Sequence, residues 1–94
     1  MALNESYRRI FQSEMETLTV SIVKSLQKIG ENPSDKNEIE KLVNSADIVV
    51  GSAKFLEDRE LEERAKMIVT LFSGSRNAKG RSAQIRRLIE QLRR

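Results

Sequence analysis

Apolar residues recur along the chain at the three- and four-residue spacing of amphipathic helices. The first stripe has successive spacings of 4, 4, 3, 4, 4 and 3 and consists of Tyr7, Phe11, Met15, Leu18, Ile22, Leu26 and Ile29. We predict a helix over about residues 4–30, capped by Asn4 and ended by Gly30, with Pro33 enforcing the stop. The stripe would also suit a long coiled-coil dimer, but it ends near three heptads, which favours packing inside an antiparallel bundle.

The second segment predicts a helix over about residues 35–56, and its stretch from Leu42 to Leu56 carries a glycine in the middle. Asp35 can cap this helix, and Glu38 three residues later completes a capping-box pattern. Its apolar face comprises Ile39, Leu42, Val43, Ala46, Val49, Val50 and Ala53. Gly51 lies off that face, and a mid-helix glycine costs about 0.5–1 kcal/mol relative to alanine. Either a neighbouring helix covers Gly51 or a partner approaches it, and the spacing leaves both alternatives open.

Two further helices complete the predicted fold. Asp58 can cap a helix over about residues 58–73, with a core stripe of Leu61, Ala65, Ile68, Leu71 and Phe72. A loop of small residues leads to a fourth helix over about residues 81–93, which we expect Ser82 to cap. Its apolar edge comprises Ile85, Leu88, Ile89 and Leu92. Because the first connection is short, we predict one all-α domain over residues 1–94, an antiparallel up-and-down four-helix bundle.

The composition agrees with one small helical domain and excludes several kinds of chemistry. The 94 residues include no cysteine and no histidine, which removes disulfides, thiolate metal sites and the usual general base. We see no opposed pair of carboxylates and no base to activate a serine, so we expect neither an enzyme, a metal nor a cofactor. No apolar run could span a membrane, and residues 1–6 lack the features of a signal peptide. We therefore expect a cytoplasmic protein.

Residues 46–56 resemble the signature helix of histidine phosphotransfer (HPt) domains, in the form found at the start of chemotaxis-type histidine kinases. That signature reads Ala-His-x-x-Lys-Gly-Ser-Ala, followed by a basic residue, Phe and Leu. The matching positions here are Ala46, Gly51, Ser52, Ala53, Lys54, Phe55 and Leu56. The resemblance implies an HPt-like bundle over nearly the whole chain. The family usually places a glycine after the Phe-Leu pair, whereas this chain has Glu57.

Two departures from the signature fall where the family's chemistry lies. Asp47 occupies the position of the phospho-accepting histidine, and Val50 occupies the position of the lysine. No other histidine can substitute, because the chain contains none. Aspartyl phosphorylation would need an acidic cluster that holds Mg²⁺, and the neighbours of Asp47 along the helix form a poor cage for it. We therefore expect a pseudo-HPt module that does not transfer phosphate.

The resemblance also implies a partner and a binding face. Ile48 and Phe55 lie seven residues apart on the polar side of the second helix, a pattern suited to helix recognition. We expect a receiver domain or a histidine kinase of a two-component pathway to dock there. The candidate partner-binding residues are Asn44, Asp47, Ile48, Gly51, Lys54 and Phe55. The residues also allow Phe55 to be covered by the first helix or by the C-terminal segment.

The charge distribution keeps two other classes of function open. Residues 1–75 hold ten basic and thirteen acidic residues, whereas residues 76–94 hold seven basic and one acidic residue. This cluster could bind nucleic acid or another anionic surface through Arg76, Lys79, Arg81, Arg86, Arg87, Arg93 and Arg94. No aromatic residue is interleaved with it, which weighs against nucleic acid. A structural role as a homo-oligomer, through the first-helix stripe or the arginine-rich helix, is the third class, so the chain is either a monomer or a homodimer.

Overall fold

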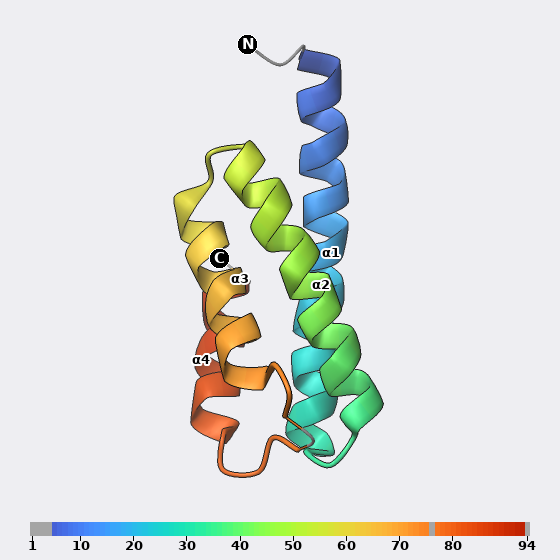
Figure 1. Cartoon of the computed structure of the whole chain (residues 1–94), viewed down its shortest axis with the longest axis vertical. Coiled ribbons are helices and arrows are strands. Elements are labelled where there is room, and N and C mark those ends of the chain that lie inside the picture. The colour runs from blue at the N-terminus through green and yellow to red at the C-terminus, as the bar shows by residue number, and fades with distance from the viewer. Residues whose placement is uncertain (1–4, 76, 94) are drawn as a thin grey trace.

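The computed structural model describes residues 5–75 and 77–93, and it folds them into four helices (Figure 1). They are α1 (Glu5–Glu31), α2 (Lys36–Phe55), α3 (Arg59–Phe72) and α4 (Ser82–Leu92). α1 lies beside α2 and α4, and α3 also lies beside α2 and α4, so the helices form a closed ring of neighbours. Successive helices run antiparallel, which confirms the predicted all-α four-helix bundle.

Each helix contributes the apolar face that its spacing predicted, except that Tyr7, the first member of the α1 stripe, is exposed. The core is a single cluster whose largest fully buried side chains include Phe72, Ile22, Leu26, Ile39 and Leu88. These side chains come from all four helices, so their burial stabilises the packing of the four helices against one another. Asp35 and Asp58 cap α2 and α3 as predicted, accepting hydrogen bonds from the backbone N–H groups of residues 38 and 61 at 3.1 and 3.2 Å.

Two details of the predicted helix ends differ in the structure: Gly30 does not end α1, and Ser82 does not cap α4. α1 continues through Gly30 and ends at Glu31, because Asn32 precedes Pro33 and a residue before proline is disfavoured in helical conformation. α4 is not capped by Ser82, which is its first helical residue. Arg81 is the cap and makes no side-chain capping bond. The capping prediction for Asn4 falls outside the described residues.

The loop before α4 sets where that helix begins. Ala78 is buried, and its N–H donates to the carbonyl of Pro33 at 2.7 Å, so the loop is held against the α1–α2 connection. Gly80 then adopts a left-handed conformation, with φ of 81°, as the chain turns into α4. This turn leaves Arg81 at the cap position, and its guanidinium lies over the ring of Phe72 at 6.0 Å from the ring centre.

α1 is longer than the helix it packs against. It has 27 residues, α2 has 20, and only residues 32–35 connect them. Because so short a connection starts the two helices side by side, about seven residues of α1, or roughly 10 Å, must extend past the end of α2. Figure 1 shows the N-terminal turns of α1 beyond the α2–α3 turn, and residues 5–10 are all exposed.

The turn between α2 and α3 has the hydrogen bonds of a Schellman motif. The N–H of Asp58 donates to the carbonyl of Ala53 at 2.9 Å, and the N–H of Glu57 donates to that of Lys54 at 3.2 Å. This geometry requires a left-handed residue at position 57, and Glu57 has a φ of 60°. Among the described residues it is the one non-glycine with a positive φ. The chain keeps the turn at the expense of backbone strain.

We predict that Glu57→Gly stabilises the fold. Glycine adopts the left-handed conformation without the steric penalty of a Cβ, so the free energy of unfolding should rise by about 0.5–1 kcal/mol in a urea titration. Glu63→Gly is the matched control, because Glu63 is exposed inside α3 and its replacement should lower stability by about 1 kcal/mol. A less stable Glu57→Gly protein would mean that the Glu57 side chain contributes more than its backbone strain costs.

Candidate functional site

The outer face of α2 combines two large exposed apolar side chains with a bare stretch of backbone. Ile48 is 56% exposed and Phe55 is 52% exposed, and seven residues, two helical turns, separate them. Gly51 lies between them on the same side of the helix. The sequence predicted this arrangement, and the structure places all three residues at the surface.

Among the described residues, no neighbouring helix covers Gly51. A Cβ added to it would meet no atom within 4 Å apart from the local helix backbone. The first of the two explanations for this glycine, packing beneath another helix, is therefore excluded among the described residues. The backbone at Gly51 is open, so another backbone could approach α2 closely there.

The overhanging part of α1 adds an aromatic side chain that the sequence analysis did not include in the site. The ring of Phe11 lies 5.1 Å from the ring of Phe55, centre to centre, with a 60° angle between the ring planes. The expectation that α1 could cover Phe55 is thus met only in part, because Phe55 remains half exposed. Tyr7, one turn before Phe11, is 59% exposed and extends the apolar surface along α1. We call Tyr7, Phe11, Ile48, Gly51 and Phe55 the α1–α2 face.

The difference in length between α1 and α2 could have predicted that Phe11 lies beside Phe55. A stripe that begins at Tyr7 on a 27-residue helix cannot be covered along its whole length by a 20-residue neighbour joined through a short loop. The first members of the stripe must therefore lie beside the end of α2, which is where Phe55 is.

Polar residues border the α1–α2 face. The predicted site residues Asn44, Asp47 and Lys54 are all exposed on α2. Within the described part of the chain, no group of three or more acidic residues is arranged to hold a metal ion. Among the described residues, Asp47 therefore belongs to no acidic cluster of the size that an aspartyl phosphorylation site uses to bind Mg²⁺.

Glu62 on α3 has a pKa that its ion-pair partner shifts. A hydrogen bond from Lys66, whose Nζ lies 2.7 Å from the carboxylate, lowers the pKa of Glu62. A catalytic carboxylate that acts as an acid or base at neutral pH needs the opposite shift. The pair lies one helical turn apart on α3 and serves as a surface ion pair.

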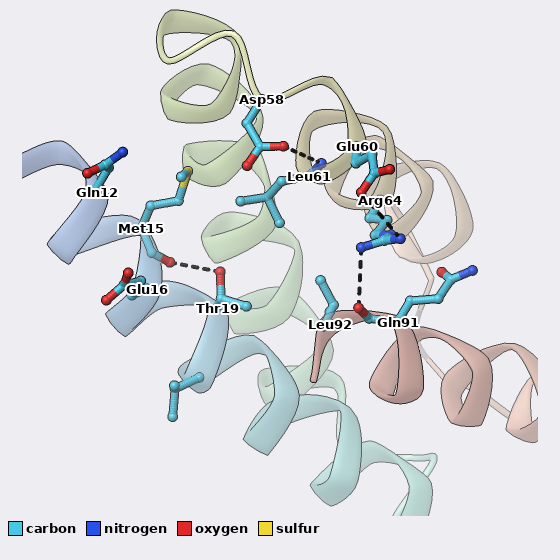
Figure 2. A pocket seen from close by; sticks show the side chains of 11 residues that line it. Gln12, Met15, Glu16, Thr19, Asp58, Glu60, Leu61, Arg64, Gln91 and Leu92 are labelled. Atoms are coloured by element: carbon cyan, nitrogen blue, oxygen red, sulfur yellow. Dashed lines mark hydrogen bonds and ion pairs between the residues drawn. The ribbon is translucent and has the colours of Figure 1, made fainter. Parts of the chain in front are cut away.

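An open pocket of about 590 Å³ lies between α1, α3 and the end of α4 (Figure 2). Its polar groups are largely engaged within the protein. Thr19 donates to the carbonyl of Met15 at 2.8 Å, and Arg64 donates to that of Gln91 at 3.3 Å. Since Asp58 is also occupied as a helix cap, we interpret this pocket as space left where the short α4 ends.

Among the described residues, the predicted basic cluster comprises one residue packed on a ring and several exposed ones. Arg76 and Arg94 lie outside the described residues. Arg81 is half-buried over Phe72, which gives it a packing role. The remaining predicted residues are exposed and lie in the loop and along α4: Lys79, Arg86, Arg87 and Arg93.

Comparison with known proteins adds no relative. No protein-family model, no curated protein and no solved structure matched the chain. Among the described residues, no helix is both long and apolar enough to cross a membrane. The interpretation of the site therefore depends on its own geometry and on the signature at residues 46–56.

We predict measurable coupling between Phe11 and Phe55. Tilted ring pairs at this distance contribute about 0.5–1.5 kcal/mol beyond the area they bury. Unfolding of Phe11→Ala, Phe55→Ala and the double variant should therefore give a coupling free energy in that range. The pair of Phe11→Ala with Met67→Ala, an exposed residue on α3, should be additive. Additive effects for Phe11 and Phe55 would show that the ring contact contributes nothing to stability.

Proposed function

We propose that this chain is a non-catalytic protein-interaction module that docks a receiver domain or a histidine kinase of a two-component pathway. The binding surface is the α1–α2 face with its polar border of Asn44, Asp47 and Lys54. Docking occurs without phosphate transfer, so the module acts by occupying its partner. A cytoplasmic location, where such partners act, is part of the same proposal.

The single observation that carries this proposal is the open glycine between two exposed apolar residues. No described residue packs on Gly51, yet it lies inside α2, four residues before the last residue of the helix, where alanine would be more favourable. Ile48 and Phe55 on either side provide the large apolar contacts that anchor protein interfaces. A partner helix lying across α2 would contact both anchors only if its backbone came close at position 51.

The nature of the partner is supported by the signature rather than by the geometry. The HPt-like residues around position 51 resemble a surface that receiver domains bind. The replacement of the phospho-accepting histidine by Asp47 removes the acceptor but leaves the surrounding surface. Asp47 then becomes a charged residue at the edge of the interface, where it affects orientation and association rate more than affinity.

Binding to nucleic acid or another anionic surface is the less supported alternative. The described basic residues are distributed over the loop and along α4, and Arg81 is committed to Phe72. The four aromatic residues are Tyr7, Phe11, Phe55 and Phe72, and none of them lies on α4. The basic residues thus lack the stacking platform that single-stranded nucleic acids require.

We predict that Gly51→Arg abolishes binding while the protein stays folded. The new side chain has room in the free protein, and arginine favours the helix over glycine by up to about 0.8 kcal/mol. In a complex the same side chain would occupy the space of the partner backbone. Calorimetric titration against the receiver domains and kinases of the source organism measures the loss of binding affinity. A thermal melt shows whether the variant is folded.

Two further variants sharpen this test. Phe55→Ala should weaken binding by roughly 1–3 kcal/mol. Thr70→Arg, an exposed arginine substitution on α3, is the matched control and should bind normally. A Gly51→Arg protein that folds and binds as before would move the interface away from the α1–α2 face.

We also predict that the chain does not accept phosphate. It contains no histidine, and Asp47 lacks a metal site among the described residues. Incubation with an active kinase or a phosphorylated receiver should leave it unlabelled, with a genuine HPt domain as the positive control. Stoichiometric, stable phosphate on Asp47 would contradict the proposal of a non-catalytic module.

A further inference from the structure

The solvent-facing edge of α1 carries a second regular stripe, separate from the core stripe. Its members follow spacings of 4, 3, 4, 4, 3 and 4, and every one of them is exposed: Arg9, Ser13, Glu16, Val20, Lys24, Gln27 and Glu31. Val20 occupies the centre and is 55% exposed. Such a spacing keeps residues along one seam of two supercoiled helices. The edge of α1 therefore has the geometry of a helix–helix contact, and its members are exposed within the described part of the chain.

The residues of the stripe are spaced symmetrically about Val20. Charged residues at equal distances on either side of Val20 have opposite charges. Glu16 and Lys24 lie four residues to either side of Val20, and Arg9 and Glu31 lie eleven residues to either side. The remaining pair, Ser13 and Gln27, is polar on both sides. When the sequence of the stripe is reversed, every basic residue therefore falls on an acidic one, and Val20 falls on itself.

Antiparallel packing of two α1 helices about a two-fold axis performs this reversal. With the axis at Val20, Glu16 of each copy faces Lys24 of the other, and Arg9 of each copy faces Glu31 of the other. The two valines meet at the centre, and Ser13 meets Gln27. A two-fold interface requires this kind of self-complementarity, because each contact occurs twice.

The charged residues of the stripe are available for such contacts. The ion pairs within the described part of the chain are Glu60–Arg64 and Glu62–Lys66, both on α3. None of the four charged stripe residues belongs to either pair. Beside Val20, an open groove of about 380 Å³ is lined by the apolar Val23 and Leu92 and by the basic Lys24 and Arg93. Val23 and Leu92 extend the apolar surface at the centre of the stripe.

We propose that two copies of this chain associate through their α1 helices, packed antiparallel about a two-fold axis at Val20. The specificity comes from the four cross-pairs between Glu16 and Lys24 and between Arg9 and Glu31. The α1–α2 face stays open, because Phe11 and Val20 are nine residues apart and thus on opposite sides of α1. This inference does not depend on the proposed docking function.

The dimer should be weak and sensitive to salt. Its apolar centre is small, and each exposed ion pair contributes little. Sedimentation equilibrium at up to about 0.5 mM protein should show dimerisation in about 20 mM salt, with an association constant at least about tenfold lower in about 500 mM salt. A chain that stays monomeric in low salt at that concentration would overturn the proposal.

Charge reversal tests the register directly. Glu16→Lys places two basic residues opposite each other at two positions of the dimer, and Lys24→Glu does the same with acidic residues. Each variant alone should associate at least about tenfold more weakly than the parent. The double variant Glu16→Lys/Lys24→Glu should associate like the parent, because the reversed charges pair again.

Mixing the two single variants gives the most decisive result. In a mixed dimer the introduced lysine of one variant would face the introduced glutamate of the other, and the unchanged Lys24 would face the unchanged Glu16. Two proteins that each self-associate more weakly than the parent should therefore bind each other. Circular dichroism melts verify that each variant is folded, and Gly51→Arg serves as a control that should dimerise normally. Failure of the single variants to associate on mixing, or dimerisation that the reversals leave unchanged, would overturn the proposed interface.

Discussion

The short connection between α1 and α2 is the constraint on which the surface of this protein depends. Four residues cannot separate the two helices, so they must pack side by side from the first turn. Their shared core of Ile22, Leu26 and Ile39 then fixes the register. Because α1 is seven residues longer, its N-terminal turns have no helix to pack against, and Phe11 meets Phe55 at the margin of the core.

Much of this architecture follows from the sequence because burial is periodic. The apolar spacing predicted all four helices, and Asp35 and Asp58 marked two starts by a local hydrogen bond that needs no tertiary context. The predictions that failed concern helix ends, whose position depends on the backbone conformation of neighbouring residues. Gly30 permits a helix end but does not impose one, whereas Pro33 restricts Asn32 and does. Ser82 is not the cap of α4, because the preceding turn places Arg81 at the cap position.

Only the part of the candidate site that lies on α2 could be predicted from the sequence. The period of α2 was enough to place Ile48, Gly51 and Phe55 on its outer side. It could not show whether another helix covered Gly51, because that depends on which helices are neighbours. Phe11 was missed for the same reason: its place in the core stripe predicts burial, and only the difference in helix length exposes that end of the stripe.

The two surfaces that we describe on α1 are compatible because a helix has two sides. The stripe centred on Val20 and the aromatic side that includes Phe11 are half a turn out of phase, so a partner on one does not obstruct the other. A two-fold dimer would carry two α1–α2 faces related by its axis. Two weak docking faces in one particle bind a dimeric partner more tightly than either alone, provided that their separation matches the partner. Self-association would therefore select among partners as well as raise affinity, because only a partner that presents two matching surfaces gains from it.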